Sequence, residues 1–169
     1  MKIKNSTPNN IDEIFNLYEM ATKFQKQKLA VHWSQFELEL IEEEIAENRQ
    51  WNISENDQII CIWATAFSDP QIWGERNSDP SIYIHRIATH VEFKGRNLVK
   101  KIVDWAIKYA KENKKEFIRM DTVGENQGLI SYYQKCGFDF IGLRKIQDAK
   151  GLPQHYLNAT VCLFELKIV

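Results

Sequence analysis

The sequence feature that most constrains the fold is a strand-like segment that runs through a glycine-containing turn into a strongly amphipathic helix. Residues 81–91 predict a strand, whose successive side chains point to two opposite sides. One side holds Ile82, Ile84, Arg86 and Ala88, and the other holds Tyr83, His85, Ile87 and Thr89. The turn at residues 93–97 follows, and residues 97–111 have helical spacing. The apolar stripe of this helix is Val99, Ile102, Val103, Ala106, Tyr109 and Ala110.

The rest of the chain predicts two helices, then a hairpin, then alternating strands and helices. Capping-box patterns begin both of the first helices, Asn10 with Glu13 and Ser34 with Glu37. Gly137 predicts the end of the last helix. The expected elements are a helix from Asn10 to about Phe24, a helix from Ser34 through Ile45, strands at Trp51–Ser54, Gln58–Phe67 and Glu116–Thr122, a helix at Asn126–Cys136, and strands at Phe138–Lys145 and Thr160–Lys167.

This order of elements predicts the α/β class. Strand–helix–strand units imply parallel pairing in the second half, and the hairpin implies antiparallel pairing in the first half. We therefore expect a mixed, mostly antiparallel central sheet flanked by helices on both faces. No repeat, low-complexity run or linker divides the chain, so residues 1–169 are expected to form a single domain.

Composition excludes several classes of function. The chain has 22 Lys and Arg against 23 Asp and Glu, which argues against a nucleic-acid binder. Its longest apolar stretch, residues 59–67, is far shorter than the about 20 residues that span a bilayer, so no membrane partner is expected. The first residues lack the apolar core of a secretory signal, which predicts a cytoplasmic protein. Cys61, Cys136 and Cys162 are widely spaced and indicate neither disulfides nor a metal site.

The turn before the amphipathic helix is a candidate anion site. A glycine-containing turn at a helix N-terminus exposes backbone N–H groups, which together with the helix dipole can bind phosphate. Lys94, Arg96, Lys100 and Lys101 place positive charge around it. A simple helix cap is the alternative interpretation of the same pattern.

A second motif follows at Asn126, Leu129, Tyr133, Gly137 and Phe138. It resembles the pattern Asn-x-x-Ala-x-x-x-Tyr-x-x-x-Gly-Phe of the GCN5-related N-acetyltransferase (GNAT) superfamily. The family's acetyl-CoA turn reads Gln/Arg-x-x-Gly-x-Gly/Ala, and here Lys94, Asn97 and Val99 stand at those positions. Lys94 keeps the charge, and Asn tolerates a positive φ better than other residues with a Cβ.

The resemblance implies a GNAT-like acyl-CoA acyltransferase fold with acetyl-CoA as cosubstrate and no metal. It implies that the turn binds the CoA phosphates, that the strand before it binds the pantetheine arm through main-chain groups, and that Asn126 contacts the arm or fixes the helix start. The implied cofactor-binding residues are Ile87, Ala88, Thr89, Lys94, Gly95, Arg96, Asn97, Leu98, Val99, Asn126 and Tyr133.

The resemblance also implies catalytic roles. Tyr133 matches the family's tyrosine acid, which protonates the thiolate leaving group. The position of a frequent family glutamate is Tyr83, a poor base at neutral pH. His85 on the same strand face and Glu75 on the preceding loop are therefore the two candidates for the general base.

The acceptor side is less specific. Trp33, Trp63, Trp73 and Tyr83 could line an aromatic pocket, with Asp69, Glu75 or Asp79 attracting a cationic amine and His155 closing over it. The leading hypothesis is an N-acetyltransferase that moves an acetyl group to a primary amine of a small molecule, amino acid or peptide by direct attack in a ternary complex. The alternatives are a catalytically weak acyl-CoA-binding or regulatory module and a nucleotide-binding protein. The chain is expected to act as a monomer or homodimer.

Overall fold

The structure is a computed structural model that describes residues 1–28 and 31–168. Its contacts divide the chain into two compact units. The first unit comprises residues 1–65 and 85–98, and the second comprises residues 66–84 and 99–169. The chain passes between them three times, at the end of strand β3 (Gln58–Ala66), in strand β4 (Ser81–Thr89) and at the start of helix α4 (Leu98–Glu112). The prediction of a single domain over residues 1–169 stays a prediction.

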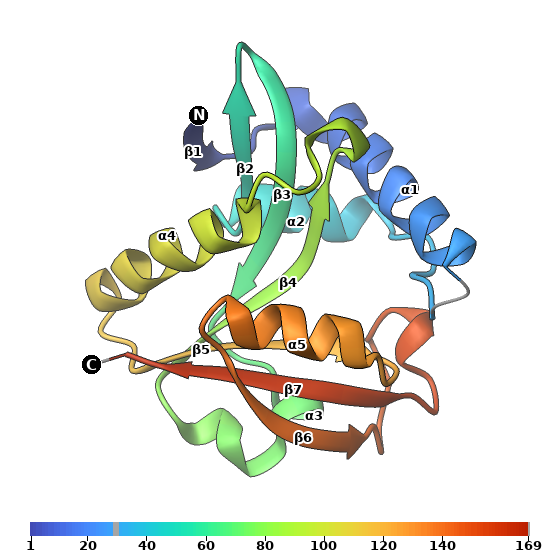
Figure 1. Ribbon diagram of the computed structural model, residues 1–169, viewed down its shortest axis with the longest axis vertical. Helices are drawn as coiled ribbons and strands as arrows, with labels where there is room; N and C mark the ends of the chain where they lie inside the picture. Colours follow the sequence, from blue (N-terminus) through green and yellow to red (C-terminus); the bar gives the residue numbers. More distant parts are fainter. Residues whose placement is uncertain (29–30, 169) are drawn as a thin grey trace. The chain divides into compact units, whose positions relative to one another are not determined.

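The first unit holds three antiparallel strands, two helices and the second half of β4 (Figure 1). Its other elements are β1 (Lys2–Asn5), α1 (Ile11–Gln27), α2 (Leu38–Ala46), β2 (Gln50–Glu55) and β3 (Gln58–Ala66). The β2–β3 hairpin turns at Asn56 and Asp57, with φ angles of +50° and +64°. Two successive left-handed residues are the signature of the turn type that matches the twist of paired strands.

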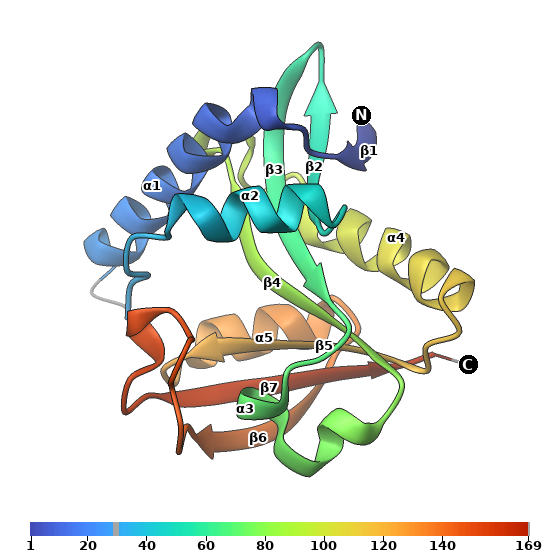
Figure 2. The ribbon, with the colours of Figure 1, turned by 180° about the vertical axis from the view of Figure 1, so that it is seen from behind.

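The core of the first unit forms because α1 and α2 each turn one apolar face toward β3. Figure 2 shows α2 passing in front of β3. The buried residues of this core are Ile14, Leu17, Tyr18, Phe36, Ile41, Ile45, Ile59, Ile62 and Ala88. The helical spacing of 14, 17 and 18, and of 41 and 45, therefore produces the contact that the sequence pattern predicts.

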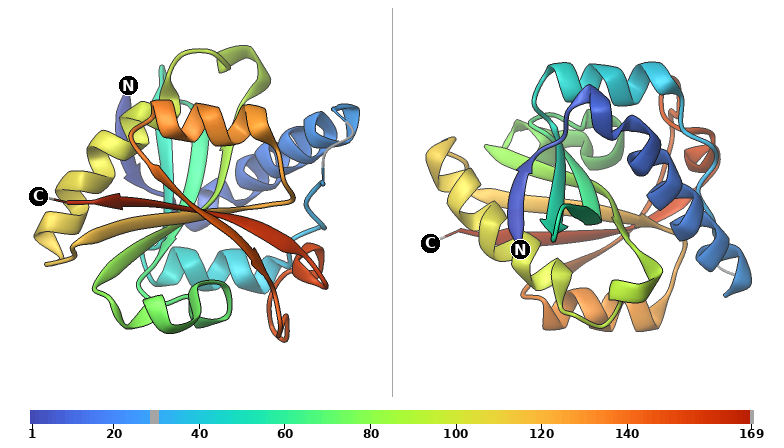
Figure 3. Two further views of the ribbon diagram at one scale, coloured as in Figure 1. Left: turned by 60° about the horizontal axis from the view of Figure 1, so that its bottom comes forward. Right: turned by 90° about the horizontal axis from the view of Figure 1, so that it is seen from above.

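The second unit is built on the strands that follow α4. Its elements besides the first half of β4 are α3 (Pro70–Trp73), α4, β5 (Phe117–Val123), α5 (Gln127–Lys135), β6 (Asp139–Lys145) and β7 (Thr160–Lys167). In Figure 3 (left), α5 lies on one face of β5 and β7, and α3 lies on the other. Adjacent residues of β7 serve the two faces, since Phe164 contacts Tyr133 of α5 and Leu163 packs in the cluster that contains Trp73. Helices thus cover both faces of these strands.

The strand order is β1-β2-β3-β4-β5-β7-β6 in one seven-stranded sheet. The pairs β1–β2, β2–β3, β5–β7 and β6–β7 are antiparallel, and β4–β5 is parallel. The predicted mixed, mostly antiparallel sheet is confirmed. The expected parallel pairing of the second half is correct for β4–α4–β5 but wrong for β5–α5–β6, because β7 lies between β5 and β6.

Several local predictions need correction. The sequence pattern missed β1, which has only four residues, and it missed α3. A helix beginning at Ser34 is wrong, because α2 starts at Leu38 after the extended residue Glu37. Helix α1 starts after Asn10 as expected, but the Asn10 Oδ1 accepts from the N–H of Thr7 (2.9 Å) instead of capping α1.

Helix α1 runs three residues past its expected end at Phe24, to Gln27, and the other boundaries agree within two residues. Gly137 ends α5 with φ +107°, and its N–H donates to the carbonyl of Gln134. Within the described residues, no helix is long and apolar enough to span a lipid bilayer.

Candidate functional site

The turn between β4 and α4 has an exposed backbone with two left-handed residues. Gly95 has φ +79° and Asn97 has φ +55°. Asn is among the few residues with a Cβ that adopt this region readily, which explains how the chain forms the turn without a glycine at position 97. Residues 94–97 are exposed, whereas Leu98 and Val99 are 3% and 8% exposed. The turn therefore presents main-chain groups, and most of the Val99 side chain is covered.

The positive charges around this turn are partly compensated. The Arg96 guanidinium donates to both carboxylate oxygens of Glu55, at 2.9 and 3.2 Å. Lys100 is paired with Asp104 one helical turn later. Burial and the nearby Lys28 lower the pKa of Lys94. The first turn of α4 contains no acidic residue, so its N–H groups face no opposing carboxylate from their own turn.

The strand before the turn holds its side chains firmly. Ala88 is buried in the core of the first unit, and the Thr89 hydroxyl lies 3.4 Å from the Cys61 sulfur. The N–H of His90 donates to the carbonyl of Ile60 (2.9 Å). Ile87 and Thr89 are half-buried. The segment predicted to bind a pantetheine arm is thus a rigid strand end.

A polar network inside the first unit was missed by the sequence analysis. Arg86 has φ +52° in the middle of β4, donates to the carboxylate of Glu44, and donates from Nε to the Tyr18 hydroxyl (3.3 Å). Its guanidinium also lies 5.2 Å from the ring centre of Phe36. A left-handed residue with a large side chain is strained, and such residues cluster at functional sites. The signal in the sequence is that Glu44 lies on the same helix face as the apolar residues Ile41 and Ile45, where a charged side chain is unusual.

His85, the candidate base on β4, is half-buried and lies near two positively charged side chains. Burial, followed by the positive charges of Arg86 and Arg49, lowers the pKa of His85 to about 3. An imidazole with so low a pKa holds a proton weakly. This electrostatic setting makes His85 a weak base.

The second unit contains the helix with the Asn126 and Tyr133 motif. Asn126 is the N-cap of α5, and its Oδ1 accepts from the N–H of Leu129 (3.0 Å). Tyr133 is 8% exposed, with its ring 5.1 Å from that of Phe164. Asn126 therefore fixes the helix start, as one of its two expected roles requires, and the Tyr133 ring is anchored by packing.

The frequent base position of the family is occupied by a buried aromatic residue. Tyr83 is 0% exposed, and its ring lies 5.9 Å from that of Trp73. Arg119 lies 4.8 Å from the Trp73 ring and pairs with Asp79 and Glu165. Asp79 is thus tied to a buried arginine. Glu75, the loop candidate for the base, is exposed on the 3-10 helix Gly74–Ser78.

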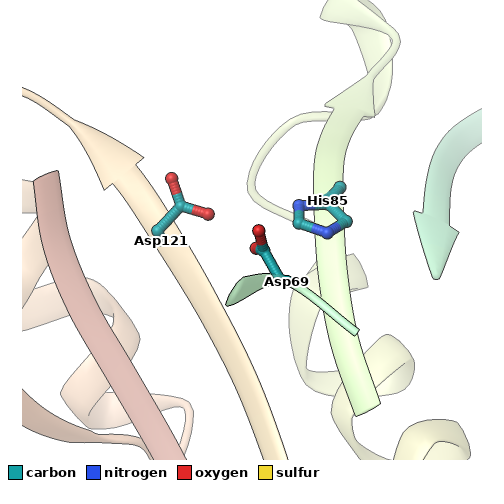
Figure 4. A group of neighbouring side chains, drawn as sticks. All are labelled: Asp69, His85 and Asp121. Carbon is teal, nitrogen blue, oxygen red and sulfur yellow. The ribbon is translucent and has the colours of Figure 1, made fainter. Parts of the chain in front are cut away.

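Two carboxyl groups of the second unit come together, Asp69 from the segment before α3 and Asp121 from β5. Figure 4 draws both side chains, and it also labels His85 on β4. Their carboxylate oxygens lie within 4.8 Å of one another. Burial and then the charge of Asp121 raise the pKa of Asp69 to about 8. The sequence analysis named Asp69 only as one of three possible acceptor contacts and missed Asp121, a charged residue inside a predicted strand.

Comparison with known proteins decides the family. The model of the acetyltransferase (GNAT) family matches residues 11–138. The chain belongs to the GNAT family. The resemblance inferred from Asn126, Tyr133 and the β4–α4 turn is thereby confirmed at the level of the family.

Individual relatives agree with this assignment. The GNAT chain is 34% identical over 84 residues to the uncharacterized N-acetyltransferase YesJ of Bacillus subtilis (strain 168), a match that covers 50% of this chain and 47% of the relative. The match thus spans about half of that protein. The fold resembles a GNAT-family acetyltransferase structure from Listeria monocytogenes 4b F2365, with a TM-score of 0.79, 20% identity, and coverage of 99% and 94% of the two chains. A Streptococcus agalactiae 2603 GNAT structure gives a TM-score of 0.77 at 20% identity, with 99% and 95% coverage.

The family generally uses acetyl-CoA, and the turn has room for a phosphate-bearing group. A Cβ added at Gly95 would meet no heavy atom within 4 Å, so the approach to its backbone is open. The exposed, left-handed turn and the start of α4 fit the diphosphate of CoA. Bound there, acetyl-CoA supplies the activated acetyl group.

Proposed function

We propose that this protein is an N-acetyltransferase that moves the acetyl group of acetyl-CoA to a primary amine of a small molecule, amino acid or peptide. The observation that carries the proposal is the combination of family membership with an exposed left-handed turn at the start of α4. The reaction needs an unprotonated amine, whereas a free alkylammonium has a pKa of about 10.4. A base must therefore act before direct attack on the thioester.

The proposed roles are those that the family resemblance implies. In the first unit, residues 94–97 hold the CoA phosphates with the N-terminal N–H groups of α4, and main-chain groups of residues 87–89 hold the pantetheine arm and the thioester oxygen. In the second unit, Tyr133 donates a proton to the departing thiolate, and Asn126 orients the start of α5. His85 and Glu75 remain the base candidates that the resemblance suggests.

The compartment and the partners complete the proposal. We place the reaction in the cytoplasm, because Cys61, Cys136 and Cys162 are buried free thiols, as a reducing compartment favours. The acceptor is an amine-bearing small molecule or peptide, and the protein acts as a monomer or homodimer.

The test has two stages that separate binding from transfer. Calorimetry with CoA, in competition with ATP, measures whether the turn belongs to a CoA site, and CoA is expected to be the tighter ligand. Incubation with acetyl-CoA and a panel of primary amines, amino acids and peptides then measures the release of free thiol. Acetylation of at least one amine supports the proposal, whereas tight CoA binding with no transfer would support a binding module instead.

A further inference from the structure

The parallel pairing of β4 and β5 stops part-way along both strands, next to Asp121. The β4–β5 pairing runs from Ser81 opposite Phe117 to Ile84 opposite Met120. Asp121 is the next residue along β5, and the chain then leads through Asn126 to Tyr133. In open sheets, ligands bind where the arrangement of neighbouring strands changes. Asp121 follows the last residue of β5 that pairs with β4, so a substrate is expected beside it.

Asp69 is held rigidly in the same unit. Its carbonyl accepts from the N–H of Trp73 (3.0 Å), and its own N–H donates to the side-chain oxygen of Asn77 (2.6 Å). The Gln71 amide donates to the carbonyls of Asp148 and Lys150, each at 2.9 Å, which ties α3 to the β6–β7 connection. Only 7% of Asp69 is exposed. The main chain that carries this buried carboxyl group is thus held on both sides, and a fixed position is what a defined proton transfer requires.

The two carboxyl groups differ in their surroundings. The Tyr156 hydroxyl, on the 3-10 helix Gln154–Tyr156, donates to Oδ2 of Asp121 (2.9 Å). Burial and then the Asp121 charge oppose ionisation of Asp69 and raise its pKa to about 8. His85, which follows Ile84 along β4, has a pKa of about 3 and adds no charge near neutral pH. Asp69 is therefore the carboxyl group of the pair whose environment favours the protonated form.

The chain lacks a carboxylate at the base position that the family often uses. Tyr83 stands there, buried against Trp73 of α3. Asp69 is the residue that caps α3. The helix that packs on Tyr83 thus begins at Asp69, whose pKa of about 8 suits a general base, because a general base works best with a pKa near the working pH.

We propose that Asp69, paired with Asp121, is the general base of the acetyl transfer, an inference that rests on the proposed function. The Asp69 carboxylate takes one proton from the acceptor ammonium. The freed amine forms the N–C bond to the acetyl carbon, and the C–S bond breaks. The thiolate receives a proton from Tyr133, which recovers one from the acetylated nitrogen, and Asp69 releases its proton to water. The sum is ammonium plus thioester giving amide, thiol and one proton.

The deciding experiment is the pH profile of kcat/KM, measured with saturating acetyl-CoA and the best amine found in the panel. We expect kcat/KM of the wild type to fall as the pH drops below about 8, which we call the acidic limb of the profile. Asp69→Asn should lower kcat/KM by about 100-fold or more and abolish the acidic limb. Asp121→Asn removes the charge that raises the pKa of Asp69, so the acidic limb of this variant is expected at lower pH. Asp139→Asn, an exposed carboxyl of β6, is the matched control and should follow wild type.

Every outcome decides the question. CoA affinity of Asp69→Asn, measured by calorimetry, should equal that of wild type and shows that the variant is folded. If Asp69→Asn keeps the wild-type limb, Asp69 is not the base, and loss of the limb in His85→Gln would assign the role to His85. If the acidic limb does not move in Asp121→Asn, Asp121 does not influence the pKa of Asp69, and the proposed pairing of the two carboxyl groups is contradicted. If wild type binds CoA but acetylates nothing in the panel, the proposed function itself fails, and the catalytic role of Asp69 fails with it.

Discussion

The guanidinium of Arg86 donates to the carboxylate of Glu44 inside the first unit, and Arg86 at the same time has a left-handed backbone in the middle of β4. Glu44 is 3% exposed and Arg86 is largely covered by Tyr18 and Phe36. A left-handed backbone costs a residue with a Cβ about 1–2 kcal/mol. The ion pair therefore stabilises a strained strand residue just before the segment that we assign to the pantetheine arm.

Replacing Glu44 should reveal this coupling. We expect Glu44→Gln to lower the free energy of unfolding by about 3–5 kcal/mol, because it leaves the Arg86 charge buried and unpaired. Denaturant unfolding followed by circular dichroism measures the change. Glu43→Gln, an exposed neighbour on α2, should change it by less than about 0.5 kcal/mol. Equal effects of the two variants would show that the ion pair contributes nothing.

Because of His85, the free energy of unfolding should fall as the pH is lowered. Its pKa is about 3 in the folded chain against 6.5 for a free side chain, so between these values the unfolded chain binds a proton that the folded chain does not. The stabilisation is therefore complete above pH 6.5 and is lost as the pH falls toward 3, with a slope of up to about 1.4 kcal/mol per pH unit. Unfolding of His85→Gln across this range should show a shallower slope, and an unchanged slope would contradict the burial of the imidazole.

The contribution of Asp69 to the free energy of unfolding should instead fall as the pH rises. Its pKa is about 8 in the folded chain against 3.8 for a free side chain, so the folded chain binds the extra proton between these values. Stability from this group is complete below pH 3.8 and is lost as the pH rises toward 8. Asp69→Asn is expected to raise the unfolding midpoint at pH 8 relative to wild type while lowering activity. A variant that is both less active and less stable would instead indicate a structural role for the carboxyl group.

The sequence predicted those parts of the fold that depend on local periodicity. Helix α4 and strand β7 have the expected spans because their apolar residues recur at the spacing of one element. Strand β1 has one apolar residue and depends on pairing with β2, so no local pattern reveals it. The predicted start of α2 was wrong because Ser and Glu three residues apart form a capping box only where the backbone between them is helical. Here the backbone is extended at Glu37.

The candidate site was predictable only where one segment carries it. The turn at Gly95 and Asn97 and the helix with Asn126 and Tyr133 are continuous motifs. Asp69 and Asp121 are 52 residues apart, and their pairing follows from packing in the second unit. The pKa of His85 depends on burial and on two arginines, which the strand pattern does not show. Contacts between distant segments therefore account for the part of the site that was missed.

The conformation of Asn97 leads to a prediction for CoA binding. Because φ is +55°, Asn97→Gly should keep the turn and bind CoA as tightly as wild type. Asn97→Val places a β-branched side chain in the left-handed region, where it costs about 1–2 kcal/mol, so CoA affinity should fall by about tenfold if the turn opens. Calorimetric titration with CoA measures both. Equal weakening in both variants would show that the Asn97 side chain, not the backbone, is what CoA contacts.

A single substitution at Tyr133 can separate the packing of its ring from the proposed proton donation by its hydroxyl. Tyr133→Phe keeps the ring that packs on Phe164 and removes only the hydroxyl, so the free energy of unfolding should change by less than about 1.5 kcal/mol. If the hydroxyl protonates the departing thiolate, kcat should fall by about 100-fold or more while the KM for acetyl-CoA stays near the wild-type value. Steady-state kinetics of thiol release measure this, with Tyr132→Phe, whose side chain is 39% exposed, as the matched control. A drop in stability with unchanged kcat would make Tyr133 a core residue, and the thiolate would then have to take its proton from water.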